Sequence, residues 1–331
     1  MKRILGKSGL EVSAMGMGCW AMGGPWTFSN DEGSWAAGWG QIDDVESTRA
    51  IQAGLDMGIN FFDTAANYGA GHSEVILGKA LANRRESVVI ATKFGFLVDP
   101  QTKSVATDDD QIVGNIRDDC EKSLGRLGTD YIDIYQLHQG SYDAEKALLV
   151  MDVLEELVNE GKIRWYGWST DNPERACVFA GGEHCTSIQF DLNVLRDNPE
   201  NRSICAKFDL GGINKSPLNR GILTGKFNPD STFPEDDIRH GLSFKEGVGA
   251  ERLSQLEAVR GVLTANGHTL AQASLAYIWA LDERMVPIPG FKTTKQVEEN
   301  AGAMELGLLS REQMQQIEEI LNQEEEQNKP R

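Results

Sequence analysis

Four polar residues lie at or just after the ends of three consecutive apolar runs. Asp63 ends the run "INFF", and Tyr68 follows it five residues later. Lys93 lies near the end of "SVVIATKFG", and His138 near the end of "DYIDIYQLHQG". If these runs are neighbouring parallel strands, about 5 Å apart, their ends meet at one edge of the sheet. The four side chains would then share one small volume.

These residue types suit proton transfer to or from an alcohol oxygen. A tyrosine with an ordinary pKa near 10 is a poor acid at neutral pH. A lysine beside it stabilises the phenolate, so we expect Lys93 to lower the pKa of Tyr68 and to make it a proton donor to a developing alkoxide. Asp63 would hold Lys93 in place, and His138 would hydrogen-bond the substrate carbonyl and orient it.

Each residue alone also has a structural interpretation. Asp63 could form a turn, Tyr68 could be a packed aromatic ring, and a histidine at a strand end is commonly a satisfied structural group. A lysine at a buried strand end needs a charged partner, which Asp63 supplies. The set fits carbonyl reduction or alcohol oxidation. It does not fit glycoside hydrolysis, which uses two carboxylates across a cleft.

Hydride transfer needs a cofactor, because no side chain delivers hydride. The turn Gly69-Ala70-Gly71 is not a dinucleotide fingerprint, since the third glycine would fall at Glu74. We interpret Ser73 as a helix cap. No phosphate-binding glycine loop or metal motif is present elsewhere. The five cysteines form no C-x-x-C pair, so we expect neither a disulfide framework nor a zinc site.

Short apolar runs alternate with amphipathic stretches along the chain, which predicts a parallel sheet. Eight such units in 331 residues favour a single closed (β/α)8 TIM barrel spanning residues 1–331 over an open sheet. The expected strands are 13–19, 60–64, 88–94, 131–138, 163–169, 187–193, 210–217 and 285–290. The expected helices are 44–57, 73–83, 110–127, 143–159, 173–180, 199–207, 251–265, 269–281 and 294–304.

Segments outside this alternation carry sequence patterns that predict other elements. The first 12 residues predict an N-terminal β-hairpin that turns at Ser8-Gly9, and a C-terminal extra helix begins at Ser310 with Gln313 completing its capping pattern. Two stretches, 21–42 and 227–249, are too long for plain connectors. Both follow strands, so they lie at the face where barrels form active sites. The tryptophans of the first stretch are candidates for a pocket wall or for a small core within the loop.

The chain carries a net charge of −18. Nucleic acid and anionic membrane surfaces would repel it, so we expect neither as a partner. An anionic ligand would need a pocket that gathers the scarce cations. The segments "NKSPLNRGILTGKF" and "PIPGFKTTKQVEEN" follow the seventh and eighth strands, where barrels commonly bind phosphate. No run is long enough to span a membrane and no secretory signal is evident, so we expect a cytoplasmic protein.

Several separate motifs resemble the aldo-keto reductase superfamily, in order and spacing, over nearly the whole chain. They are "FFDTAANYGAGHSE", "VVIATKFG", "DYIDIYQLH" and "VPIPGFKTTKQVEENAGA", and the type they most resemble is the bacterial general-stress-protein and inositol-associated one. The resemblance implies a (β/α)8 barrel and a nicotinamide cofactor bound without a Rossmann domain. It also implies a tetrad of Asp63, Tyr68, Lys93 and His138, with Tyr68 as general acid/base.

The resemblance further implies a set of cofactor contacts. Segment 216–221 resembles the pyrophosphate-wrapping segment, and Lys292 resembles the base that meets the adenosine 2′-phosphate, which favours NADPH (NADP) while leaving NAD possible. Ser169 and Gln189 resemble the groups that hold the carboxamide, and Trp20 borders the nicotinamide. The contacts implied are Trp20, Ser169, Gln189, Lys215, Ser216, Pro217, Leu218, Arg220, Gly221, Gly290, Lys292, Gln296, Glu299 and Asn300. For Gln296, a capping box with Thr293 is an equally good explanation.

Several positions depart from the family pattern, among them Gln139-Gly140, where a proline often follows the catalytic histidine. Lys215 stands where the family usually has an aromatic that stacks on the nicotinamide, Thr170 replaces an asparagine, and Thr293 replaces a second basic residue. If Lys215 points at the nicotinamide, its charge disfavours the oxidised, cationic ring. If it points away, another group must do the stacking.

Three functions fit these observations. The first is an NADPH-dependent reductase of aldehydes, ketones or sugar-like carbonyls. The second is an NAD(P)-dependent sugar or polyol dehydrogenase that works in the oxidative direction. The third is a non-catalytic subunit that senses the cofactor, against which the intact tetrad argues. The expected partner is a small-molecule carbonyl or sugar substrate, and the sequence leaves the oligomeric state open.

Overall fold

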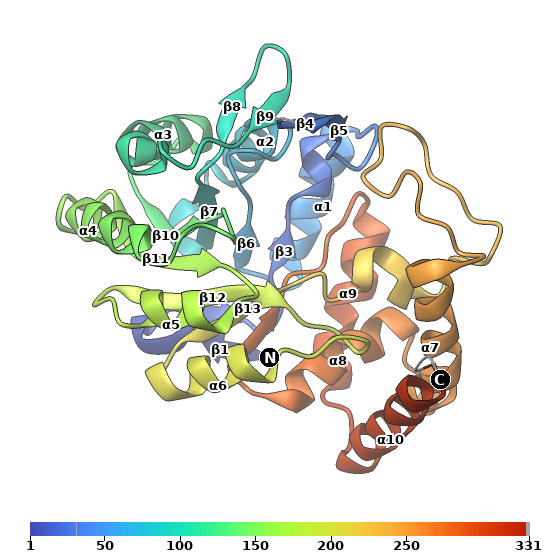
Figure 1. Ribbon diagram of the computed structural model, residues 1–331. Coiled ribbons are helices and arrows are strands. Elements are labelled where there is room, and N and C mark those ends of the chain that lie inside the picture. Colours follow the sequence, from blue (N-terminus) through green and yellow to red (C-terminus); the bar gives the residue numbers. More distant parts are fainter. Residues whose placement is uncertain (31, 329–331) are drawn as a thin grey trace.

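The computed structural model describes residues 1–30 and 32–328. Eight parallel strands form one sheet in the order β14-β13-β12-β11-β10-β7-β6-β3 (Figure 1). The two end strands meet through a parallel bridge between Gly18 and Gly290, and Gly18 N donates to Pro289 O at 3.1 Å. The predicted (β/α)8 barrel is confirmed. Its strands are β3 (Met17–Gly18), β6 (Phe61–Asp63), β7 (Val89–Phe94), β10 (Ile132–Leu137), β11 (Ile163–Ser169), β12 (Cys185–Asp191), β13 (Gly211–Lys215) and β14 (Met285–Pro287).

Helices surround the strands (Figure 1). They are α1 (Asp44–Asp56), α2 (His72–Leu81), α3 (Ile112–Leu127), α4 (Lys146–Asn159), α5 (Pro173–Ala180), α6 (Pro199–Phe208), α7 (Gly247–Thr264), α8 (Leu270–Leu281), α9 (Thr294–Leu306) and α10 (Arg311–Asn328). The starts of α5 and α6 follow from local sequence. Each begins with a proline, whose missing N–H costs nothing there, directly after an asparagine that caps the helix.

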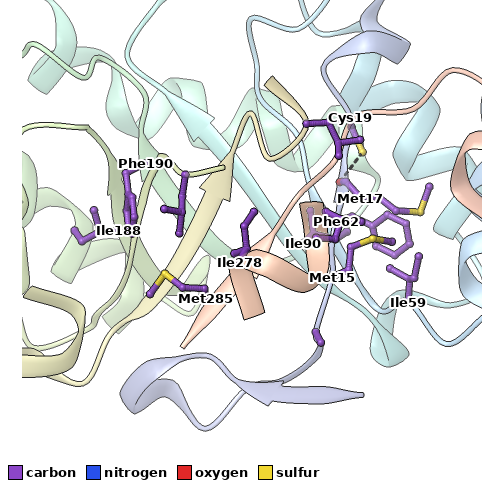
Figure 2. Packing of buried hydrophobic residues seen from close by; sticks show 14 of the residues in the cluster. Met15, Met17, Cys19, Ile59, Phe62, Ile90, Ile188, Phe190, Ile278 and Met285 are labelled. Atoms are coloured by element: carbon purple, nitrogen blue, oxygen red, sulfur yellow. Dashed lines mark hydrogen bonds between the residues drawn. The ribbon is translucent and has the colours of Figure 1, made fainter. Parts of the chain in front are cut away.

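Side chains alternate between two hydrophobic layers along each strand. The barrel interior holds an inner cluster that includes Phe61, Ile134 and Ile213. A larger outer cluster lies between strands and helices. In Figure 2, Met15, Met17 and Phe62 from neighbouring segments lie together, as do Ile188, Phe190 and Met285. Side chains in a strand alternate with a period of two residues. A residue two positions after an inner-cluster residue therefore also points into the barrel.

The predicted N-terminal hairpin is confirmed by β1 (Lys2–Ile4) and β2 (Glu11–Ser13), which pair antiparallel. It lies across the amino ends of the strands. Leu5 is fully buried in the inner cluster, Lys7 N donates to Asp209 O at 2.8 Å, and Thr186 Oγ1 donates to Leu5 O at 2.8 Å. The hairpin therefore closes the end of the barrel opposite to the expected active site.

The C-terminal extra helix is α10, which packs against α7. Its predicted capping pattern is confirmed: Ser310 N donates to Gln313 Oε1 at 3.1 Å, and Gln313 N donates to Ser310 Oγ at 3.2 Å. In the described part of the chain, no helix combines the length and the apolar character that crossing a membrane requires.

The sequence missed a second sheet at the barrel mouth. Strands β4 (Thr27–Asn30) and β5 (Gly33–Ala36) come from the first long stretch, and β8 (Leu97–Asp99) and β9 (Ser104–Ala106) follow β7. They pair in the order β5-β4-β9-β8 and lie together at the top of Figure 1. Each strand has three or four residues, too few for an alternating pattern to stand out, and the partners β4 and β9 are far apart in sequence.

Candidate active site

The structure brings the four predicted polar residues together at the barrel mouth. Asp63 is the last residue of β6, Lys93 lies in β7, and His138 directly follows β10. Alternation places Lys93 two residues after the inner-cluster residue Ala91, so its side chain points inward. Tyr68 lies in the loop after β6. Its ring centroid is 5.6 Å from that of His138, at an interplanar angle of 81°.

Lys93 is fully buried, and its ammonium is saturated with acceptors. Its Nζ lies 2.5 Å from Asp63 Oδ1, and it donates to Thr64 O at 2.8 Å and to Tyr68 Oη at 3.3 Å. Burial lowers the pKa of Lys93, and the charge and hydrogen bond of Asp63 counter that effect. The predicted pairing of Lys93 with Asp63 is confirmed, and it gives a buried charge the partner that it requires.

The expected lowering of the Tyr68 pKa is wrong for this structure. Burial is the largest effect and raises the pKa of Tyr68 well above its ordinary value, and the nearby Asp63 carboxylate adds to the rise. The side chain is only 7% exposed, so the phenolate would lose nearly all of its hydration. Tyr68 is therefore held protonated, with Lys93 placed to stabilise negative charge once the proton has left.

The imidazole of His138 is neutral at ordinary pH. Burial lowers its pKa well below the usual range, and the positive charges of Lys93 and Lys215 lower it further. Nδ1 lies 2.9 Å from Oδ1 of Asn67, a buried side chain. This contact fixes the orientation of the ring and ties its tautomer to the Asn67 amide. The sequence analysis missed Asn67, although its position directly before Tyr68 was available as a signal.

A left-handed turn holds Tyr68 in place. Gly69, Ala70 and Gly71 have φ values of +62°, +54° and +94°. Gly69 also lies against the backbone of Gly23, where a Cβ atom would stand 2.0 Å from the carbonyl oxygen. Only glycine fits that approach, which joins the Tyr68 loop to the segment after β3.

Ser73 does not cap α2, so that interpretation is wrong. The helix begins one residue earlier, at His72, and its cap position, Gly71, has no side chain to act as an acceptor. Ser73 Oγ instead donates to Cys19 O at 2.9 Å and lies 2.8 Å from Thr64 Oγ1. The buried hydroxyl thus fixes α2 to the ends of β3 and β6, because its position inside the first turn faces the barrel.

Asp63 is also held by side chains from β10 and β12, two strands that do not pair with β6. Gln189 Nε2 donates to Asp63 Oδ2 at 2.8 Å, and Gln136 Nε2 does so at 3.3 Å. Ser169 Oγ in turn donates to Gln189 Oε1 at 3.3 Å. Ser169 and Gln189, which were predicted as cofactor contacts, are therefore coupled to the tetrad through hydrogen bonds.

A cavity of about 730 Å³ opens above these residues. Every predicted site residue lines it except Lys93, which lies behind Asp63 and Tyr68. Residues outside the predicted set of catalytic and cofactor contacts line it as well. They are Gly18, Ala21, Phe28, Ala37, Asn67, Phe96, Gly140, Asp191, Asn193, Arg196, Asn219, Thr224, Lys226, Ile238, Arg239, Arg252, Ile288 and Phe291.

Aromatic rings form one wall of this cavity. Trp20 stacks on Tyr68, with ring centroids 5.7 Å apart, and Trp20 Nε1 donates to Ala37 O at 3.0 Å. Phe96 packs edge-on against His138 at 5.2 Å and contacts Phe28 at 5.9 Å. Trp26, Trp35 and Trp39 line the cavity too, and Trp26 also belongs to a small hydrophobic cluster with Ala37 and Val105, so the first long stretch forms both a pocket wall and a small core.

The opposite part of the cavity gathers cations, as the charge argument required. Lys292 Nζ donates to Trp39 O, and Arg252 Nη1 donates to Asn219 Oδ1 at 2.9 Å. Both partners are neutral oxygens. Partial desolvation and the charges of Arg239 and Lys292 lower the pKa of Lys226. Cations that repel one another in a protein of charge −18 provide a site for a polyanion.

The segment between these cations and the tetrad has an unusual backbone. Ser216, Asn219 and Arg220 have φ values of +52°, +46° and +52°, although none is glycine. Such residues cost about 1–3 kcal/mol each and persist where surrounding contacts enforce them. Asn193 Nδ2 donates to Ser216 O at 3.1 Å and supplies one such contact. The predicted pyrophosphate segment is thus a strained, tightly held turn.

Helix α9 presents the last group of predicted contacts. Gln296, Glu299 and Asn300 lie in its first two turns and line the cavity. Thr293 caps the helix by accepting from Gln296 N. Gln296 Oε1 accepts from Lys292 N at 2.7 Å rather than from Thr293 N. The capping box therefore lacks its return hydrogen bond from Thr293 N to Gln296. Gln296 instead fixes the backbone of Lys292.

Lys215 does not reach across the cavity. It ends β13, and its Nζ lies 3.0 Å from Asp171 Oδ2, in an ion pair along the cavity wall. Both side chains are one-third exposed. The position that the family usually fills with an aromatic ring therefore holds a paired charge.

One further cluster has the residue types of a metal site. Glu155, Glu183 and His184 offer ligand atoms within 4.8 Å of one another. His184 Nδ1 lies 2.5 Å from Glu155 Oε2, and Tyr166 Oη donates to Glu155 Oε1 at 2.6 Å. The cluster precedes β12 and lies at the amino end of that strand, away from the cavity. We assign it a structural role.

Comparison with known proteins agrees with this architecture. The sequence model of the Aldo/keto reductase family matches residues 14–322. A probable aldo-keto reductase 1 of Glycine max is 30% identical over 310 residues, covering 92% of this chain and 84% of its own length. The glycerol dehydrogenase AKR11B4 of Gluconobacter oxydans superposes with a TM-score of 0.80 at 29% identity, over 98% of this chain and 95% of its own. An aldo-keto reductase of Klebsiella pneumoniae in complex with NADPH gives a TM-score of 0.68 at 25% identity, over 97% and 95%. The chain therefore belongs to the aldo/keto reductase family.

Proposed function

We propose that this protein is an NADPH-dependent oxidoreductase that reduces aldehydes, ketones or sugar-like carbonyls to alcohols. The observation that carries the proposal is the buried contact of a protonated Tyr68 with Lys93, beside the neutral His138, at the base of a cavity that also gathers cations. NADP is the favoured cofactor, and NAD is the alternative.

The reduced nicotinamide would supply the hydride. In our proposal, Tyr68 donates its phenolic proton to the carbonyl oxygen as negative charge develops there. Lys93 stabilises the resulting phenolate, and Asp63 keeps Lys93 charged and in place. His138 would orient the substrate oxygen by donating from Nε2, in the tautomer in which Nδ1 accepts from the amide NH2 of a flipped Asn67. The wall of Trp20 and Phe96 excludes water.

The residues that line the cavity fit a dinucleotide. Ser169 and Gln189 would hold the carboxamide next to the tetrad, and the strained segment 216–221 would wrap the pyrophosphate. Lys292 would meet a 2′-phosphate, with Lys226 and Arg252 adding positive charge. These cations have neutral oxygens as their polar partners or repel one another, which supports a phosphate ligand. The similar Klebsiella pneumoniae protein was solved in complex with NADPH.

A second candidate is oxidation of a polyol or sugar by the same residues in the reverse direction. It is supported by the similarity to the glycerol dehydrogenase of Gluconobacter oxydans. Initial rates with NADPH and a carbonyl panel, compared with rates with NADP⁺ or NAD⁺ and a polyol and sugar panel, distinguish the two directions.

The test of the proposal is Tyr68→Phe, which removes only the hydroxyl. We expect NADPH to bind as it does to the wild type, while turnover falls by about 100-fold or more. Tyr135→Phe is the matched control, because Tyr135 is also fully buried and its hydroxyl has no hydrogen-bond partner in the part of the chain that the structure describes. Full turnover by Tyr68→Phe would refute the assignment. NADPH binding by the wild type without turnover on either panel would favour a non-catalytic, cofactor-sensing role.

A further inference from the structure

A row of charged side chains lies one step nearer the mouth than Ser169 and Gln189. Ser169 pairs with Gln189 across β11 and β12, and Asp191 pairs with Lys215 across β12 and β13. Asp191 is two residues beyond Gln189, so it points to the same face, about 7 Å farther along the strand. Asp171 joins the row by accepting from Asp191 N at 2.7 Å.

Only some of the charged side chains in this row line the cavity. Arg196 Nη1 lies 2.8 Å from Asp191 Oδ2 and its Nη2 lies 4.0 Å from Asp171 Oδ2, so Arg196 pairs mainly with Asp191, and both of these residues line the cavity. Lys215 also lines the cavity, but its partner Asp171 is not part of the lining. The ammonium of Lys215 is therefore nearer to the cavity than the carboxylate that balances it.

The field of Lys215 reaches the catalytic centre. Burial and Lys93 are the main reasons that the pKa of His138 is low, and Lys215 contributes as well. Asp171 is not among the groups that shift His138. The four charges of the row sum to zero, so a ligand between His138 and Lys215 experiences a positive potential because Lys215 lines the cavity and Asp171 does not.

We propose that the Lys215–Asp171 pair sets the relative affinity of the protein for the oxidised and reduced nicotinamide cofactor. The inference rests on the proposed function, in which Ser169 and Gln189 hold the carboxamide directly below the charged row. The oxidised ring carries one positive charge and the reduced ring carries none. Lys215 weakens binding of the oxidised form, and Asp171 limits that effect by pairing with Lys215.

The test measures Kd for NADP⁺ and for NADPH by titration, using quenching of the fluorescence of the seven tryptophans and calorimetry as a check. The quantity of interest is the ratio of the two Kd values, oxidised over reduced. Lys215→Met removes the charge and keeps the chain length, so the ratio should fall by about threefold to tenfold, as for one partly screened unit charge. Asp171→Asn leaves Lys215 unpaired, so the ratio should rise.

Two controls separate charge from general disruption. Lys215→Arg keeps the charge and should keep the wild-type ratio. Lys146→Met removes a similar ion pair, with Asp110 at 2.9 Å on the surface at the start of α4, and should change neither Kd. Thermal unfolding midpoints of all variants verify that they are folded.

The outcomes are distinguishable. If Lys215→Met and Asp171→Asn change both Kd values by the same factor, or change neither, the inference is overturned while the proposed function stands. If the wild type binds neither NADP⁺ nor NADPH but binds NAD⁺ or NADH, the same ratio is measured with that pair. If it binds no nicotinamide cofactor, the proposed function fails and the inference fails with it.

Discussion

At the scale of single residues, the environment of His138 has the clearest consequence. The ring is buried against Tyr68 and Phe96, and two lysines add positive charge around it. A histidine whose pKa is depressed by folding binds fewer protons than it does in the unfolded chain. Its contribution to stability is therefore complete above its ordinary pKa of about 6.5 and is lost as the pH falls below that value.

Asn67→Asp should reverse this behaviour. It places a carboxylate 2.9 Å from Nδ1, which favours the imidazolium and raises the pKa of His138. The chain has only five histidines, so ¹⁵N NMR of histidine-labelled protein can follow each ring. We expect His138 to stay neutral below the ordinary histidine pKa of about 6.5 in the wild type and to titrate at higher pH in the variant. Identical titrations would show that Asn67 does not control this ring.

At the scale of elements, the two long loops join over the cavity. Ile238 N donates to Gly38 O at 2.7 Å, and Gly40 N donates to Asp236 O at 3.1 Å. We call this junction the loop clasp, comprising residues 38–40 and 236–239. The guanidinium of Arg239 lies 4.7 Å from the centroid of the Trp39 ring. The clasp therefore covers the cation-rich part of the cavity, where the cofactor phosphates are proposed to bind.

Arg239→Leu should loosen the clasp. The change removes the cation–π contact with Trp39 and the pairing with Asp237, and one such contact is worth about 0.5–2 kcal/mol. We expect NADPH to dissociate about tenfold faster, measured by stopped-flow fluorescence. Lys245→Leu, which breaks an exposed ion pair of the same loop with Asp230, should leave the rate unchanged. Equal rates in the two variants would contradict this role of the clasp.

The sequence predicted the parts of this structure that depend on local periodicity. Strand ends placed the tetrad correctly, because alternation within a barrel strand fixes which side chains point inward. It did not predict the sheet of β4, β5, β8 and β9, whose short strands pair over long sequence distances. The predicted direction of the Tyr68 pKa shift was wrong for a related reason. The residue types suggested the effect of Lys93, but the degree of burial, which is the larger effect, depends on tertiary packing.

At the scale of the whole molecule, the N-terminal hairpin contributes to stability through one close approach. A Cβ at Gly6 would stand 2.6 Å from Thr186 O and 2.7 Å from Asp209 O, and φ there is +54°. Gly9 of the same hairpin has φ +69° but nothing within 4 Å. The two glycines share a left-handed backbone and differ in the space around them.

Gly6→Ala and Gly9→Ala therefore form a matched pair. Gly9→Ala should lower the free energy of unfolding by about 1–2 kcal/mol, the ordinary penalty for an L-residue in this conformation. Gly6→Ala should cost about 2–5 kcal/mol, because a steric clash with the barrel is added. The thermal unfolding midpoint should fall much further for Gly6→Ala. Equal midpoints would show that the hairpin is not locked against the amino ends of the strands.

The small sheet at the mouth has a consequence for how this protein can change over evolution. Among residues 1–30 and 32–328, strands β4, β5, β8 and β9 pair only with one another, and not with the strands of the barrel. They carry or adjoin the aromatic wall, whereas Asp63 and Lys93 belong to the barrel strands themselves. Substitutions in this sheet can therefore change the shape of the cavity wall while the barrel strands that hold the proposed proton-transfer residues stay the same.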